Sequence, residues 1–162
     1  MLRIGRIGSK VFYLDASAIV KRYVLEKGSE FVDHVISHRK PLSTTRLSYV
    51  EIHSALARKK REGMLTASDH AAVTRQFEEE FEAFGRIELR PDILSAARDL
   101  LVRHPLRALD AIHLASALRV AKQLGRGVVF LGADRRLLGA AEAEGLRALD
   151  VERADQSKVA LE

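Results

Sequence analysis

Short apolar runs alternate along the chain with longer stretches in which apolar residues recur every three or four positions. The runs at residues 11–15, 42–45, 87–89, 128–131 and 147–151 are typical of buried strands. The periodic stretches predict helices at residues 17–26, 29–39, 47–62, 66–84, 91–104, 108–124 and 134–144. The runs at 87–89 and 147–151 are the weakest signals, so we expect a sheet of five or four strands. Strands that alternate with helices indicate an α/β fold with a mainly parallel sheet and helices on both of its faces.

The chain has 162 residues, which is enough for one compact domain and too few for two ordinary ones. We place this domain at residues 11–151, after an N-terminal extension of residues 1–10. Residues 152–162 lack apolar periodicity and are expected to form a loose tail. No apolar run approaches the length of a membrane span, and the basic N-terminus lacks the apolar core of a secretory signal. A cytoplasmic protein is the resulting expectation.

Charge and cysteine content narrow the chemistry. Lys and Arg total 27 against 22 Asp and Glu, a formal net charge of +5. This balance favours a polyanionic partner such as nucleic acid, although it also serves plain solubility. The chain has no cysteine, which excludes disulfides and thiolate metal sites.

Two acidic residues follow predicted strands. Asp15 ends the first strand, and Asp134 comes just after the run VVFLG at the start of a helix. In a parallel sheet the carboxyl ends of the strands share one edge, where ligands bind. Aspartate also caps helix N-termini well, so capping alone is an alternative explanation for both residues.

Two further acids interrupt apolar helix faces. Helical counting from position 47 gives an inward stripe that contains Glu51, and counting from position 106 gives one that contains Asp110. The first stripe comprises Leu47, Val50, Glu51, Ser54 and Ala55, and the second Leu106, Leu109, Asp110, His113, Leu114 and Ala117. An inward carboxylate requires a base, a metal or water as a partner. Alternatively, Glu51 lies at the edge of its stripe beside a base, and Asp110 is an early-turn residue favoured by the helix dipole.

One arrangement accounts for all four acids. If Asp15, Glu51, Asp110 and Asp134 converge, their mutual repulsion requires a divalent cation. Ligation by oxygen atoms alone favours Mg²⁺ or Mn²⁺ over Zn²⁺.

Four segments, in this order, resemble the PIN-domain ribonucleases and in particular the VapC-type toxins of type II toxin–antitoxin systems. They are YLDASAIVKRY at 13–23, LSYVEIHSALARK at 47–59, LRALDAIHLASAL at 106–118 and FLGADRRLLGAAEAEGL at 130–146. The resemblance covers about residues 11–150. It implies a three-layer α/β/α sandwich in which Asp15, Glu51, Asp110 and Asp134 are the catalytic acids that hold Mg²⁺ or Mn²⁺.

The same resemblance implies cleavage of single-stranded RNA to leave a 5′-phosphate and a 3′-hydroxyl. It also implies a cognate antitoxin protein and a homodimer. One position departs from the family: many relatives have Ser or Thr where this chain has Gly132. Ser17 is expected to supply a hydroxyl near Asp15 instead, as it does in the family.

Substrate contacts are expected from arginines close in sequence to the acids, because guanidinium groups bind phosphate in a bidentate manner. These candidates are Arg22, Arg107, Arg135 and Arg136. Ordinary solvated or paired arginines are the alternative. His113 follows Asp110 on the same face, where it either contacts metal or substrate or is a hydrogen-bonded core histidine.

A metal-dependent endoribonuclease is therefore the predicted function. The alternative is a catalytically weak or inactive PIN-like scaffold that binds RNA or protein, which the missing hydroxyl at Gly132 keeps open. A phosphatase of the haloacid-dehalogenase type is disfavoured, because it needs a second Asp where this chain has Ser17.

Overall fold

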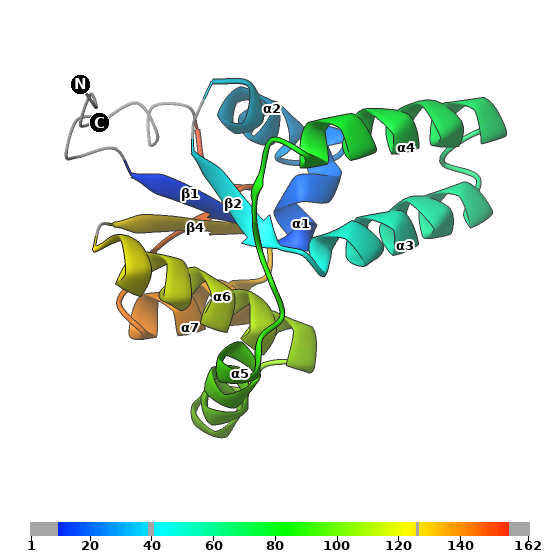
Figure 1. Cartoon of the computed structure of the whole chain (residues 1–162). Helices are drawn as coiled ribbons and strands as arrows, with labels where there is room; N and C mark the ends of the chain where they lie inside the picture. Colours follow the sequence, from blue (N-terminus) through cyan, green and yellow to red (C-terminus); the bar gives the residue numbers. More distant parts are fainter. Residues whose placement is uncertain (1–9, 39–40, 126, 156–162) are drawn as a thin grey trace, which may run out of the picture.

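The computed structural model describes residues 10–38, 41–125 and 127–155. In these residues a five-stranded, fully parallel sheet has the strand order β3-β2-β1-β4-β5 (Figure 1). The strands are β1 (Val11–Leu14), β2 (Leu42–Thr45), β3 (Gly85–Ile87), β4 (Val128–Gly132) and β5 (Arg147–Asp150). The predicted α/β class is confirmed, with five strands rather than four.

The helices follow the predicted order. They are α1 (Ala16–Ile19) with the 3₁₀ turn η1 (Val20–Arg22), α2 (Ser29–His38), α3 (Ser48–Arg61), α4 (Ala67–Phe81), α5 (Pro91–Arg103), α6 (Ala108–Leu124) and α7 (Arg135–Ala143). None of the helices in the described part of the chain is long and apolar enough to cross a membrane.

Side chains of β1 alternate between the two faces of the sheet and enter two separate cores. Phe12 and Leu14 pack with residues of α1 to α4, whereas Val11 and Tyr13 pack with residues of α5, α6 and α7. Figure 1 shows these two groups of helices on opposite sides of the sheet. The expected three-layer α/β/α sandwich follows from this period-two alternation.

The chain reverses its direction of travel across the sheet at β1. From β1 it continues to β2 and β3 on one side, and it later returns to add β4 and β5 on the other. Crevices that bind ligands form at such a switch point, beyond the carboxyl ends of the two strands that flank it. Here those strands are β1 and β4.

Two predicted elements need correction. The helix expected at residues 17–26 ends early: α1 has one turn, and η1 follows, where the Tyr23 amide donates to the Val20 carbonyl. The third strand lies at Gly85–Ile87 instead of residues 87–89, because pairing with β2 sets Gly85 opposite Ser43. Tertiary pairing therefore overrode the local apolar pattern.

The tail prediction also needs correction at its beginning. Glu152 accepts a hydrogen bond from the buried Lys21, with Nζ and Oε1 2.8 Å apart, and Ala154 packs against the core. Residues 152–154 thus contact the domain. Residues 1–9 and 156–162 lie outside the described residues, so the extension and the rest of the tail stay predictions.

Candidate active site: an acidic cleft at the strand switch point

A cleft of about 780 Å³ opens beyond the carboxyl ends of β1 and β4. All four acids named from the sequence, Asp15, Glu51, Asp110 and Asp134, line it. They come from four elements: Asp15 follows β1, Glu51 and Asp110 lie in the first turns of α3 and α6, and Asp134 caps α7. Segments far apart in sequence thus bring carboxylates to one edge of the sheet.

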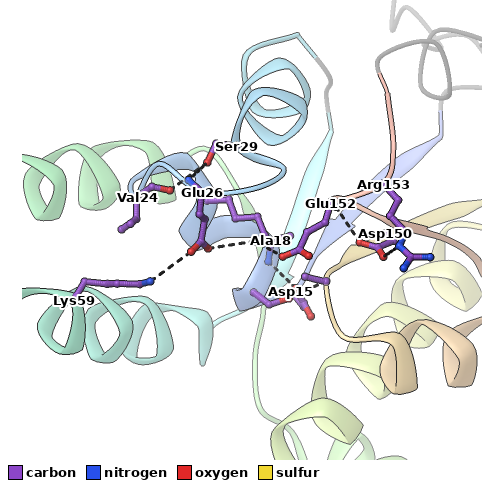
Figure 2. Close-up of polar contacts among 12 residues, drawn as sticks. Asp15, Ala18, Val24, Glu26, Ser29, Lys59, Asp150, Glu152 and Arg153 are labelled. Carbon is purple, nitrogen blue, oxygen red and sulfur yellow. Dashed lines mark hydrogen bonds and ion pairs between the residues drawn. The ribbon is translucent and has the colours of Figure 1, made fainter. Parts of the chain in front are cut away.

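Asp15 is the most buried of the four, with 4% of its surface exposed. Its Oδ1 atom accepts hydrogen bonds from the Ala18 amide at 2.9 Å and the Ser17 hydroxyl at 2.7 Å (Figure 2 shows the Ala18 bond). Burial raises the pKa of Asp15 above its ordinary value, and the nearby His113 ring and these hydrogen bonds oppose that rise. Asp15 is therefore a desolvated carboxylate with donors on one oxygen.

Gly132 faces the other oxygen of Asp15. A Cβ atom at position 132 would lie 2.9 Å from Asp15 Oδ2, so a larger residue requires one of the two to move. The Ser17 hydroxyl donates to Asp15 and accepts from the Ala133 amide at 3.1 Å. As expected from the sequence, Ser17 supplies a hydroxyl at this point, and it links the ends of β1 and β4.

Glu51 faces the cleft, and the predicted inward stripe around it was wrong. The buried positions of α3 are Ser48, Ile52 and Leu56, whereas Val50 is 60% exposed. Glu51 lies at the boundary, as one of the alternatives stated, and its Oε2 atom is 2.8 Å from His113 Nε2. The apolar period identified a real stripe, but that stripe borders the cleft and not the core.

The second predicted stripe is only partly inward. Leu109 is 46% exposed, and Asp110 is half-buried at the mouth of the cleft. His113 and Leu114, one turn later, are buried as expected. In the first turn of α6, Ala111 packs into the core, whereas Leu109 and Asp110 line the cleft.

Asp134 caps α7, as its alternative anticipated, and Asp110 is an early-turn residue of α6 that also takes part in a capping box. Asp110 Oδ2 accepts from the Arg107 amide at 3.3 Å and from its guanidinium Nε at 3.0 Å. Asp134 Oδ1 accepts from the amides of Arg136 at 2.8 Å and Leu137 at 3.2 Å. Capping and cleft lining coexist, because the helix N-termini themselves point into the cleft.

The structure separates the four candidate arginines. Arg107 lines the cleft and bridges two acids, since its Nη2 atom is also 3.6 Å from Asp134 Oδ2. Arg135 and Arg136 are exposed in the first turn of α7 beside Asp134. Arg22 is outside the lining of the cleft, and its guanidinium is held by Glu80 at 2.9 Å and Asp33 at 3.2 Å. Arg22 is therefore an ordinary paired arginine, which was the alternative to a substrate contact.

Sequence reasoning missed Lys21. Its side chain is 5% exposed and lines the cleft, and its Nζ atom binds Glu26 at 3.2 Å and Glu152 at 2.8 Å. Glu152 lines the same cleft as Asp15, and Figure 2 shows Glu26 bound on its other side to Lys59. A lysine within the apolar segment 18–24 was the available signal, because lysine is rarely buried without acidic partners.

The donor set fits a hard divalent cation. The four acids named from the sequence all offer oxygen, and Asp15 brings a buried carboxylate whose charge a cation would stabilise. Within the described residues no three acidic or histidine side chains already form a coordination group. Mg²⁺ commonly uses one or two carboxylates and completes its shell with water and phosphate oxygens, so an open arrangement is compatible with it.

These features define a class of protein: a parallel α/β/α sandwich whose carboxylates gather in a cleft at the switch point. Comparison with known proteins agrees. The PIN domain family model matches residues 12–146. Over 135 residues the chain is 38% identical to ribonuclease VapC45 of Mycobacterium tuberculosis (strain CDC 1551 / Oshkosh), covering 83% of this chain and 92% of that protein.

Two proteins of Pyrobaculum aerophilum are also similar. Ribonuclease VapC3 is 28% identical over 111 residues, which cover 68% of this chain and 84% of that protein. The crystal structure of PAE2754 aligns with a TM-score of 0.63 at 27% sequence identity, over 93% of this chain and 89% of that chain. The chain belongs to the PIN domain family, among its VapC-type members, which confirms the resemblance found in the sequence.

Proposed function

We propose that this protein is a Mg²⁺- or Mn²⁺-dependent endoribonuclease that cleaves single-stranded RNA by attack of water, and that it is the toxin of a toxin–antitoxin pair. The observation that carries the proposal is the convergence of Asp15, Glu51, Asp110 and Asp134 on one cleft from four separate elements. The name ribonuclease, given to the VapC relatives, supports RNA as the substrate.

Each residue of the site has its own proposed role. Asp15, Glu51 and Asp110 are the proposed principal ligands, with Asp134 as the fourth acid and Ser17 as the hydroxyl that orients Asp15. A divalent cation bound by these acids would lower the pKa of a water molecule and neutralise charge on the scissile phosphate. Ser17 and the Ala18 amide fix one oxygen of Asp15, which leaves the other facing Gly132 and the cleft.

Substrate binding is assigned to Arg107, Arg135 and Arg136 at the rim of the cleft. Arg107 is 70% exposed on its side chain, so it can exchange its carboxylate contacts for a phosphate. The net charge of +5 favours approach of a polyanion. Arg22 is left out of this set because Glu80 and Asp33 occupy its guanidinium.

The proposed partners are a cognate antitoxin protein that covers the cleft and a second copy of this chain. A cytoplasmic location is part of the same proposal. RNA is the substrate in this scheme, and a scaffold that binds RNA without cutting it is the rival.

Cleavage of a labelled single-stranded RNA pool tests the proposal. Chelator-stripped wild type should cut only after Mn²⁺ or Mg²⁺ is restored, and Asp15→Asn and Asp110→Asn should each lower the rate at least about 100-fold, because both remove charge from the centre. Asp99→Asn is the matched control, since Asp99 is exposed on α5 and is not among the residues that line the cleft. It should cut like wild type.

Folded wild type that cuts none of the varied RNAs with either metal would favour the scaffold instead. Full activity of both Asn variants in restored metal would contradict the assignment of the acids.

A further inference from the structure

A chain of polar side chains runs from the core into the cleft. Tyr13, on β1, is fully buried, and its hydroxyl lies 3.0 Å from Nδ1 of His113 on α6. His113 is 3% exposed, and its Nε2 atom lies 2.8 Å from Oε2 of Glu51 on α3. Three elements from both layers of helices and the sheet thus meet in one line of hydrogen bonds.

The line of hydrogen bonds has a defined direction. The buried Tyr13 hydroxyl is a neutral phenol, so it can donate its proton to Nδ1. A neutral imidazole that accepts at Nδ1 carries its proton at Nε2, where it donates to the Glu51 carboxylate. Both nitrogens of His113 are then used, and the tautomer is set by Tyr13.

The ring environment fixes this line in place. Tyr13 stacks on Phe130 with ring centroids 5.4 Å apart, and it meets His113 edge to face at 6.0 Å. Neither ring can rotate freely in a packed core. Glu51, in contrast, lies at the open cleft, and a half-buried glutamate otherwise has considerable rotamer freedom.

We propose that Tyr13 and His113 are positioning residues that hold the Glu51 carboxylate in the orientation required to bind a divalent cation. The inference deepens the proposed function and rests on it. Tyr13 acts only through His113, and His113 acts only through Glu51. Partners behind a metal ligand commonly change metal affinity by about 10-fold to 100-fold when they are removed.

The same types of contact occur elsewhere in the molecule and provide matched controls. Tyr23 donates to Glu80 at 2.8 Å, and His104 Nε2 lies 2.7 Å from Glu144 Oε1. Both pairs are absent from the residues that line the cleft. Variants that lose either contact therefore measure how a hydrogen bond of this type affects folding, without any effect on the cleft.

The test is calorimetric titration of Mn²⁺ into the RNA-free protein at a temperature where each variant is folded. His113→Asn keeps an acceptor near Tyr13 but removes the donor to Glu51, and it should weaken Mn²⁺ binding about 10-fold. His113→Gln places an amide donor near the Nε2 position and should recover part of that loss. Tyr13→Phe should weaken binding a few-fold, and the double variant Tyr13→Phe/His113→Asn should bind like His113→Asn alone.

Tyr23→Phe and His104→Asn should bind Mn²⁺ as wild type does. In the wild type, the ¹⁵N resonance of His113 Nε2 should shift with Mg²⁺ saturation while that of His104 does not, and this readout does not depend on any variant folding.

Wild-type binding that is unchanged in Tyr13→Phe and in the folded His113 variants overturns this inference and leaves the proposed nuclease intact. A ¹⁵N resonance of His113 Nε2 that does not shift on Mg²⁺ saturation also overturns the inference. Wild type that binds neither metal overturns both the inference and the metal dependence of the proposed function.

Discussion

At the scale of single residues, two acids of the cleft each have two roles. Asp15 caps α1 and also lines the cleft, and Asp134 does the same for α7. A helix N-terminus stabilises a carboxylate with its free amides, so one geometry serves both roles. The local explanation and the functional explanation of these residues are therefore compatible.

Gly132 leaves room for the Asp15 carboxylate, because it has no side chain. A Cβ atom there would lie 2.9 Å from Oδ2 and 3.2 Å from Cγ of Asp15. The carboxylate cannot retreat easily, because Ser17 and Ala18 hold its other oxygen. A Ser or Thr at position 132 would therefore require the Asp15 carboxylate to lie elsewhere.

Gly132→Ala should displace the Asp15 carboxylate. We expect a loss of about 1 to 3 kcal/mol in the free energy of unfolding, typical of overpacking, and a fall in RNA cleavage. Urea unfolding and the labelled-RNA assay measure the two effects. Gly139→Ala is the matched control: its Cβ meets nothing within 4 Å, and an alanine in the interior of α7 should add up to about 1 kcal/mol. If Gly132→Ala is as stable and as active as the wild type, position 132 does not control where the Asp15 carboxylate lies.

At the scale of elements, α3 shows why a periodic pattern can be assigned to the wrong face. Its core side is Ser48, Ile52 and Leu56, and the neighbouring stripe with Val50 and Glu51 borders the cleft. Both stripes have helical spacing and two large apolar residues, so the apolar pattern alone could not tell which of them faces the core. An exposed apolar residue beside an acid therefore marked the face that borders the cleft.

Helix α4 begins with a capping box whose residues are not among those that line the cleft. The Thr66 hydroxyl accepts from the Asp69 amide at 3.0 Å, and Asp69 Oδ2 accepts from the Thr66 amide at 3.2 Å. Thr66→Ala should lower the free energy of unfolding by about 1 kcal/mol and leave RNA cleavage unchanged.

Thermal or urea unfolding of Thr66→Ala checks this expectation. Ser95→Ala is its control, because the Ser95 hydroxyl only donates to the Pro91 carbonyl within α5, and the change should stay within about 0.5 kcal/mol. Equal stability of both variants would show that the cap contributes nothing.

At the scale of the whole molecule, ion pairs join elements that lie far apart in the sequence. Glu80 on α4 accepts from Arg22 and from Tyr23. Burial alone would raise the pKa of Glu80, but the hydrogen bonds from Arg22, Gln76 and Tyr23 outweigh it and leave this pKa below its ordinary value of 4.5. Glu80 thus stabilises the fold in its charged form.

The stabilisation by Glu80 should depend on pH in a definite direction. Because the pKa is lower in the folded protein, the contribution is present above pH 4.5 and is lost as the pH falls through the folded value. Glu80→Gln should therefore be about 1 to 2 kcal/mol less stable than wild type at pH 7, with the gap closing in acid.

Urea unfolding between pH 3 and 7 measures that gap. Glu79→Gln, at an exposed neighbouring position, should follow the wild-type curve. A constant gap across this range would rule out the charged form of Glu80 as the cause.

The sequence by itself determined the alternation of strands and helices, the three-layer class and four of the acids that line the cleft. It could do so because apolar periodicity and the position of a carboxylate after a strand are local features. The order of Asp15, Glu51, Asp110 and Asp134 in recognisable segments then identified the PIN domain family, which comparison confirmed.

Tertiary structure alone decided the partners of these groups. Tyr13 and His113 are 100 positions apart, and His113 and Glu51 are 62 apart, so no local pattern could join them. No local pattern could predict the ion pair of Arg22 with Glu80 or that of the buried Lys21 with Glu152 either. A helical period says which residues share a face but not what that face meets, because the packing of layers depends on contacts between distant segments.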